Sequence, residues 1–579
     1  MESASSGLGL SARFSRLMNR LAVRRAARAA PAKGFVLQPE PRTIGLYARG
    51  RQLISGHFLM AGRLMEEPGA SLWSLAPQDA IFAAEAHGFA WLDDLAAVGD
   101  GAARARAQEW TWDWIARYGR GHGPGWSPDL TGRRLIRWIN HAIFLLNGRT
   151  PEQSTAFFAA LSVQVEFAAR RWPAAKPGLP RFEALTGLIY AGLALRGLNH
   201  HAGAAIQALA ADCATEIDAQ GGILTRNPEE LLEVLTLLTW AAQALTEAGR
   251  ALPAAQAQAI ARIAPCLRSL RHADGGLARF HGGGSGQEGR LDMALAASGV
   301  RAAAGPGPSM GYLRLSAGRT TVIIDAADPP SGQAGAQAHA STLGFELTSG
   351  RRPMIVSCGP GSAFGQVWGR AGRATASHSV LSLDGYSSSR MGKGQADALV
   401  ERAHVVMARP LNSEDGQGYA MAHDGWLRTH GLTQTRAVTL SSGGRWLAGN
   451  DRLAAETEEG QQMLARVIAR RRGEPLRFQG RFHLHPDVEA SLDLGGTAVS
   501  LVLRSGEVWV FRPTTAAELT IEPSVYLEKG RLKPRGTQQI VLAGTVEGHG
   551  ALIGWTLAKA QDTPLAIRDL YRDEGSEQV

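Results

Sequence analysis

The spacing of apolar residues divides the chain into two regions. From about residue 45 to 300, apolar residues recur at helical spacing, as Trp110, Trp114 and Ile115 do in the stretch that begins at Ala102. This pattern predicts helix after helix, including segments at 151–172, 182–196, 202–219, 228–248 and 254–270. Successive helical hairpins bury their inner faces by closing into a ring or by stacking. No fixed-period repeat is present, which argues against a regular solenoid.

Alternating apolar and polar residues dominate after Gly311. The runs YLRLSAGRTTVIIDA, TLGFELTSGRRPMIVSC, SHSVLSLDG and AVSLVLRSGEVWVFRP predict short strands joined by glycine turns, as in a β-sandwich or a layered β-domain. Between the two regions, the glycine-rich run from His281 to Gly289 lacks the Gly-Lys-Ser/Thr of a phosphate-binding loop. We interpret this run as a flexible linker, with the domain boundary near 290–310.

Composition and charge restrict the function. A chain of 579 residues exceeds what one hydrophobic core usually organises, and its 61 basic and 52 acidic residues give a net charge of +9. This sign favours a polyanionic partner: nucleic acid, an anionic membrane or an acidic polysaccharide. No recognition-helix or base-stacking motif is evident, so we expect no nucleic-acid partner. Three widely spaced cysteines, Cys213, Cys266 and Cys358, predict no disulfide framework and permit a reducing compartment.

The first 44 residues form a basic extension. Their arginines cluster between Arg13 and Arg28, and Glu2 is the sole acid among the first thirty residues. No apolar segment of signal-peptide or membrane-span length is evident, which predicts a cytoplasmic protein without a transmembrane segment. Two interpretations stay open: a frayed basic extension, or a surface helix that touches anionic lipid or polymer.

The stretch 337–385 carries the most specific chemistry. It sets His339 and His378 into strand-like sequence, and two imidazoles on neighbouring strands can bind metal, move a proton or hold an anionic sugar. The blocks QAHASTLGFEL and ASHSVLSLDG resemble the C-terminal β-domain signature of the heparinase II/III family of polysaccharide lyases. The runs GGILTRNPEELLEVL, RSLRHADGGLARFHGGG and RFHLHPDVEA also resemble pieces of this family, particularly of its bacterial members without a signal peptide.

The resemblance implies an incomplete α/α toroid at residues 45–290 followed by an antiparallel β-sandwich at 305–579. It also implies β-elimination on a uronic-acid-containing acidic polysaccharide. This reaction needs groups that neutralise the uronate carboxylate, remove the C5 proton and protonate the leaving oxygen. Such lyases meet their polymer outside the cytoplasm, so the periplasm or cell envelope is the alternative compartment, and a homodimer is one assembly the resemblance allows.

Carried over residue by residue, the resemblance places Gln337 where the family's first histidine stands, Ser341 at an aspartate position and Glu230 at the catalytic tyrosine. The predicted catalytic residues are His339, His378, Glu230 and Asn227. The predicted substrate-binding residues are Arg226, Gln337, Glu346, Arg370 and Arg373.

Metal binding and catalysis both depend on the replaced residues. Some relatives hold a metal in the β-domain; His339 and His378 match two of its ligand positions, but Ser357 stands at the aspartate. Two histidines without a third ligand make a poor site, so we expect no cofactor, with a divalent metal such as zinc as the alternative. The replacements also motivate a second hypothesis, a catalytically degenerate protein that binds acidic glycan in envelope polysaccharide biogenesis. Hydrolysis by paired carboxylates is disfavoured, because Glu229 and Glu230 are adjacent in a predicted helix and point apart.

Overall fold

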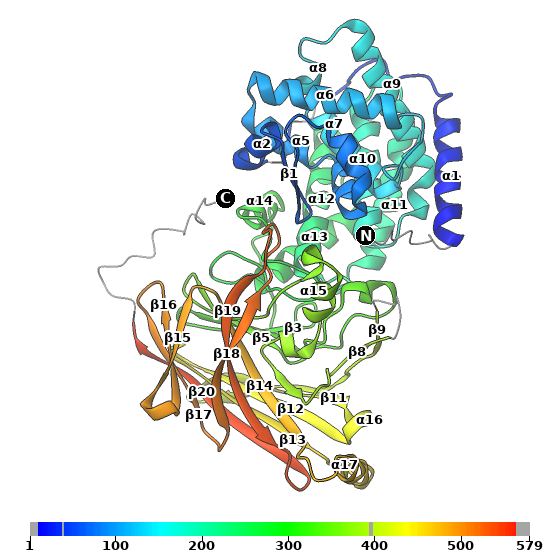
Figure 1. Ribbon diagram of the computed structural model, residues 1–579. Helices are drawn as coiled ribbons and strands as arrows, with labels where there is room; N and C mark the ends of the chain where they lie inside the picture. The colour runs from blue at the N-terminus through cyan, green and yellow to red at the C-terminus, as the bar shows by residue number, and fades with distance from the viewer. Residues whose placement is uncertain (1–9, 38–39, 44, 393–397, 563–579) are drawn as a thin grey trace. The chain divides into compact units, whose positions relative to one another are not determined.

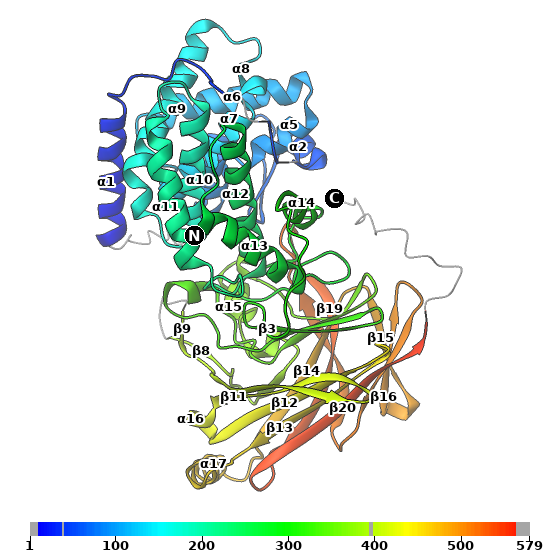
Figure 2. The ribbon, with the colours of Figure 1, turned by 180° about the vertical axis from the view of Figure 1, so that it is seen from behind.

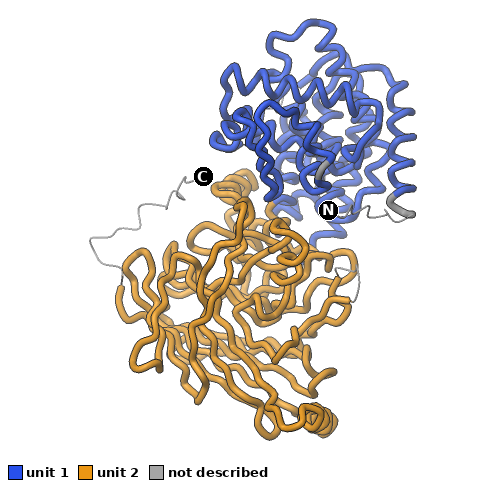
Figure 3. Tube along the Cα trace, in the orientation of Figure 1, with its two compact units in different colours: residues 1–219, 233–262 blue, residues 220–232, 263–579 orange. Residues whose placement is uncertain are grey.

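A computed structural model describes residues 10–37, 40–43, 45–392 and 398–562. It divides into two compact units: a helical unit of residues 1–219 and 233–262, and a β unit of residues 220–232 and 263–579 (Figure 3). The segment 220–232 and the chain from Ile263 onward therefore belong to the β unit. The domain limits expected from the sequence are drawn differently and stay a prediction.

Helices make up most of the helical unit (Figure 1), and the predicted helices are confirmed to within a few residues. Helix α9 begins at Pro151, which has no backbone N–H that would need a partner in the first turn. The side chains of Thr150 and Gln153 each accept a hydrogen bond from the other residue's backbone N–H. The helices are α1 (Leu10–Ala26), α2 (Tyr47–Ile54), α3 (Leu72–Leu75), α4 (Ala80–Gly88), α5 (Trp91–Val98), α6 (Gly101–Tyr118), α7 (Pro128–Asn140), α8 (Ala142–Leu146), α9 (Pro151–Arg171), α10 (Leu179–Ala194), α11 (His200–Glu216), α12 (Pro228–Glu247) and α13 (Ala254–Ser269), with a hairpin of β1 (His57–Met60) and β2 (Arg63–Glu66).

Aromatic side chains fill the centre of the helical unit. Trp110, Trp114 and Trp138 are fully buried, and the Arg134 guanidinium lies 4.1 Å from the Trp114 ring centroid. The pair α7 and α10 approaches closely at a glycine, because a Cβ on Gly187 would lie 2.5 Å from backbone atoms of α7. Within the described part of the chain, no helix has the length and apolarity needed to cross a bilayer.

Two antiparallel eight-stranded sheets form the β unit and are visible as layers in Figures 1 and 2. The first sheet runs β10 (Val405–Ser413), β11 (Gly416–Trp426), β12 (Leu432–Ser441), β13 (Trp446–Ala454), β20 (Gly550–Gln561), β17 (Val508–Pro513), β16 (Ala498–Leu503) and β15 (Val488–Asp493). The second runs β18 (Glu518–Tyr526), β19 (Arg535–Thr545), β14 (Arg477–Leu484), β6 (Arg352–Val356), β5 (Phe345–Ser349), β4 (Thr320–Asp325) and β3 (Tyr312–Ala317), with β7 (Leu381–Leu383) beside β14. Smaller elements are β8 (Arg390–Met391), β9 (Leu399–Glu401), α14 (Arg290–Ala297), α15 (Gln366–Ala371), α16 (Leu427–His430) and α17 (Glu458–Arg470).

The apolar core of the β unit lies between the two sheets. Phe345 of one sheet stacks on Trp555 of the other with ring centroids 5.7 Å apart, and Phe482 packs on Phe511 at 4.8 Å. Along β12, buried and half-buried residues alternate, as the period of a strand with one face in the core requires. The predicted order, helices first and an antiparallel β-sandwich second, is confirmed.

Candidate active site

Three buried histidines of the β unit, which we name the histidine cluster, lie together: His281, His339 and His378. The ring centroids of His281 and His339 are 6.1 Å apart, and those of His339 and His378 are 5.1 Å apart. None of the three residues is more than 1% exposed. They come from three loops, after α13, after the 3-10 helix Gly332–Gln337 and after the 3-10 helix Thr375–Ser377. His339 and His378 therefore lie side by side together with a third imidazole, but the expectation that they stand on neighbouring strands is wrong, because both lie in loops.

Backbone N–H groups donate hydrogen bonds to one ring nitrogen of His339 and to one ring nitrogen of His281. Gly282 N–H donates to His339 Nε2 at 3.0 Å, and His339 N–H donates to His281 Nδ1 at 3.1 Å. Since each of these nitrogens accepts a hydrogen bond, the proton of each neutral ring sits on the other nitrogen. His281 Nε2 then faces Asp325 Oδ2 at 3.4 Å. Among the residues that the structure describes, neither His339 Nδ1 nor His378 Nε2 has a hydrogen-bond partner.

Asp325, fully buried at the end of β4, contacts the histidine cluster through His281. Its Oδ1 accepts from Arg226 Nη2 at 2.5 Å, and its Oδ2 accepts from the Ser341 hydroxyl at 2.6 Å. Burial opposes ionisation, but the charge of Arg226 and the hydrogen bonds from His281 and Ser341 outweigh it and hold the pKa of Asp325 well below its usual value. The serine at the family's aspartate position thus supports a carboxylate supplied by a neighbouring strand.

Arg226 is engaged within the protein. Its guanidinium also donates to the carbonyl oxygens of Met310, Gly311, Ala327 and Asp328. Tyr312 donates its hydroxyl hydrogen bond to the Arg226 carbonyl at 2.6 Å. A contact with substrate, the role predicted for Arg226, would require the guanidinium to give up some of these bonds.

His378 and Glu346 belong to one hydrogen-bonded chain. The Ser357 hydroxyl lies 2.9 Å from His378 Nδ1, and Ser357 N–H donates to Glu346 Oε1 at 3.2 Å. The other oxygen of Glu346 accepts from Arg279 N–H at 3.0 Å and faces His272 Nε2 at 3.3 Å. Glu346 is 2% exposed, so it positions Ser357 and through it His378 rather than facing solvent.

Burial keeps the cluster neutral. It lowers the pKa of His378 to about 3, with the charge of His483 adding to the effect. Burial also lowers the pKa of His339 well below its usual value, and the neighbouring His378 and His281 lower it further. The pKa of His281 is lowered by burial although Asp325 opposes the shift.

Two further predicted residues, Asn227 and Gln337, lie beside the glycines that follow His281. The Asn227 side chain caps α12 by accepting from the N–H groups of Glu229 and Glu230 at 3.0 and 3.2 Å. A Cβ on Gly282 would lie 2.9 Å from the Gln337 side chain, and one on Gly283 would lie 2.5 Å from Asn227 Oδ1. Gln337 is exposed, so it forms a solvent-facing edge beside the buried imidazoles.

The two predicted arginines lie in and just after α15. Arg373 is buried and donates from Nε to the carbonyl of Ala338, the residue before His339, at 2.8 Å. Arg370, within α15, is half-buried. Arg373 thereby holds the loop that carries His339.

Sequence reasoning missed His281 and Asp325. The interpretation of the glycine run as a flexible linker is wrong for residues 281–284, because His281, Gly283 and Gly284 are buried and Gly284 N–H donates to Glu229 Oε2 at 2.9 Å. The signal was present in the RFHGGG block, where His281 stands directly before three glycines. In the structure its φ of 48° marks a constrained backbone. Asp325 ends an apolar strand, where a buried acid needs a cationic partner.

The family's metal position does not fit these residues. Ser357 gives His378 a hydroxyl partner in place of a carboxylate ligand. In the described residues, the one group of three His, Cys, Asp or Glu ligand atoms within 4.8 Å of one another is Glu166, His200 and His201, in the helical unit. There Arg170 lies 2.7 Å from Glu166 Oε2, and its positive charge opposes a cation.

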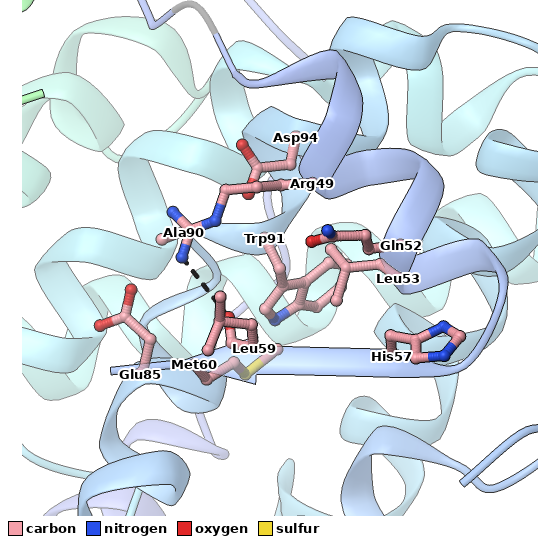
Figure 4. A pocket seen from close by; sticks show the side chains of 10 residues that line it. All are labelled: Arg49, Gln52, Leu53, His57, Leu59, Met60, Glu85, Ala90, Trp91 and Asp94. Carbon is pink, nitrogen blue, oxygen red and sulfur yellow. Dashed lines mark hydrogen bonds between the residues drawn. The ribbon is translucent and has the colours of Figure 1, made fainter. Parts of the chain in front are cut away.

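A separate pocket lies in the helical unit and includes none of the predicted site residues. Figure 4 shows the Trp91 indole between Arg49 and Asp94 on one side and His57 on the other. Burial raises the pKa of Asp94 to about 6, and Asp93 and Glu85 add to the shift. The lining residues are Arg49, Gln52, Leu53, His57, Leu59, Met60, Glu85, Ala90, Trp91 and Asp94.

Comparison with known proteins gives three kinds of match. Residues 300–556 match the family model described as "Heparinase II/III-like, C-terminal". The chain is 31% identical over 549 residues to FtsZ-localized protein C of Caulobacter vibrioides, covering 91% of each protein. Its fold is similar to the crystal structure of heparinase III, with 12% identity, 95% and 90% of the two chains covered and a TM-score of 0.68. It is also similar to heparan sulfate lyase HepC from Pedobacter heparinus in a mutant form, with 13% identity, 96% and 90% coverage and a TM-score of 0.56.

Proposed function

Because the chain belongs to the heparinase II/III family, we propose that its β unit binds an acidic, uronic-acid-containing polysaccharide without cleaving it. The fold is that of polysaccharide lyases. The net charge of +9 suits a polyanion. The replacements at Gln337, Ser341 and Glu230 favour binding without catalysis.

The state of the histidine lone pairs carries the proposal. A base that removes the C5 proton needs a free lone pair within reach of substrate. His281 Nδ1 and His339 Nε2 each accept a hydrogen bond from a backbone N–H group, so neither lone pair is free. Both rings are also buried within the protein. Gln337, at the position of the family's base, is an amide and cannot take a proton at neutral pH.

A binding and cleavage assay tests this function. The full chain is incubated with heparin-like, alginate-like and bacterial acidic exopolysaccharides while affinity and ultraviolet absorbance of a new C4–C5 double bond are followed. We expect binding without growth of absorbance. Gln337→Glu adds a negative charge at the exposed edge of the cluster and is expected to weaken binding about tenfold.

Gln333→Glu is the matched control, since Gln333 is exposed on the same 3-10 helix and the substitution changes net charge equally. It is expected to change affinity less than about twofold. Absence of binding to every acidic polymer would sink the proposal. Equal weakening by both substitutions would show that binding does not involve the histidine cluster.

The second candidate is β-elimination itself, favoured by one observation. His378 Nε2 has no hydrogen-bond partner among the described residues, so no group of the described chain occupies this ring nitrogen. In that case the same assay gives growing absorbance, and His378→Ala abolishes it while leaving affinity unchanged.

We also propose that the protein shares the localisation for which its relative is named. The relative FtsZ-localized protein C matches along 91% of this chain, so the whole chain carries the similarity. A fluorescent fusion imaged together with FtsZ in the native host tests this. We expect the two signals to coincide, and a signal outside the cytoplasm or spread evenly through the cell would contradict it.

A further inference from the structure

Helix α1 has two apolar faces, and one of them is docked on the helical unit. Ala22, Val23 and Ala26 are buried, and α1 packs along α9. Asn19, on the same face, donates to the Trp126 carbonyl at 2.8 Å and accepts from Arg171 Nε at 2.8 Å. Figures 1 and 2 both place α1 at the outer edge of the helical unit. The docked face therefore has its apolar side chains buried and its Asn19 side chain hydrogen-bonded.

The opposite face exposes large apolar side chains, which we name the α1 stripe: Phe14, Leu17 and Leu21. These side chains are 64%, 54% and 41% exposed. Their spacing of three and four residues aligns them along one side of the helix. The small apolar residues thus face the protein, and the large ones face outward. Single exposed apolar residues are ordinary, but an aligned row of them marks an interaction surface.

Arginines flank the α1 stripe. Arg13, Arg16, Arg20 and Arg24 follow one another at spacings of three and four residues, which places them along one side of the stripe, and Arg25 lies on the other. The sequence has no acidic residue between Glu2 and Glu40. An exposed apolar row beside a basic row is typical of a helix that lies in the interface of an anionic membrane.

We propose that α1 attaches the protein to an anionic lipid bilayer, with the α1 stripe inserted among the acyl chains and the arginines on the lipid phosphates. A polysaccharide would satisfy the arginines but has no apolar interior for the stripe. A second copy that covered the stripe in an antiparallel arrangement would bring the two arginine rows to the same side of the contact, where like charges repel. This membrane attachment goes beyond the proposed glycan binding and does not depend on it.

Vesicle co-sedimentation of the full chain tests the proposal. We expect the protein to sediment with phosphatidylcholine vesicles that contain phosphatidylglycerol and not with phosphatidylcholine alone, and added salt should release it. Leu17→Glu places a charge in the middle of the stripe and is expected to lower vesicle affinity about tenfold. The docked residues of α1 are untouched, so the thermal midpoint should match that of the parent protein.

Ser15→Glu is the matched control, because Ser15 is exposed on α1 outside the stripe and the same charge is added. It is expected to change vesicle affinity less than about threefold. Failure to sediment with anionic vesicles, or equal losses in the two variants, would overturn the proposal. A dimer that Leu17→Glu dissociates, without vesicle binding, would likewise overturn it and assign the stripe to a second copy.

Discussion

Replacing Asp325 with asparagine is expected to lower the free energy of unfolding by about 3–5 kcal/mol. The substitution keeps the shape of the side chain but removes the charge that pairs with Arg226 at 2.5 Å and faces His281 at 3.4 Å. Both partners are then left in a site where Asp325 itself is 0% exposed. Urea unfolding of the full chain at neutral pH measures the loss.

The effect of Asp325→Asn should depend on pH in a stated direction. The pKa of Asp325 is held below its unfolded-state value of about 4, so the carboxylate contributes fully above that pH and its contribution is lost as the pH falls further. The difference between the parent and the variant should therefore narrow below about pH 4. Asp384→Asn, which removes a partly exposed pair with Arg471, is the control and should change stability little. Equal losses in both variants would mean that Asp325 does not hold the cluster.

Replacing Arg436 with methionine is expected to cost a similar amount, about 3–5 kcal/mol. Arg436, on β12 and 0% exposed, donates from Nε and Nη2 to the two oxygens of Asp451 at 2.7 and 2.9 Å. Its Nη1 reaches the carbonyls of Leu343 and Ser379, which precede strands of the other sheet. Methionine has a similar length but leaves Asp451 charged and buried, and it leaves both carbonyls without this donor.

A double-mutant cycle with Asp451→Asn separates the pair from its surroundings. We expect the double variant to lose less stability than the sum of the single variants, because neither partner is then left charged and alone. Arg452→Met on the neighbouring strand β13 removes an exposed pair with Glu456 and should have little effect. Strict additivity in the cycle would contradict a coupled ion pair between the neighbouring strands β12 and β13.

The sequence predicted the fold to a large extent, because periodicity is a local property. Helical spacing from 151 to 270 predicted α9 to α13, and alternation predicted the hairpins β3–β4, β5–β6 and β16–β17. The family resemblance, now supported along the chain, correctly indicated a helical region followed by a β-sandwich. The sequence also indicated that His339 and His378 could converge, but it placed them on neighbouring strands, whereas both lie in loops.

What each polar residue does was decided by partners distant in sequence. Asp325 is paired with Arg226, which is 99 residues away, and His281 and His339 engage each other's loops across 58 and 57 residues. Single-residue patterns carry no information on such pairs, so Arg226 and Glu346 looked available for substrate although the tertiary structure commits both to internal hydrogen bonds. The same holds for α1. Its arginines are evident in the sequence, but only the structure shows which apolar side packs on the helical unit and which side is exposed. The sequence by itself determined the elements, their order and the residues near the histidines; only the tertiary structure decided which of their hydrogen-bonding groups are already engaged, because those bonds form between segments that meet after folding.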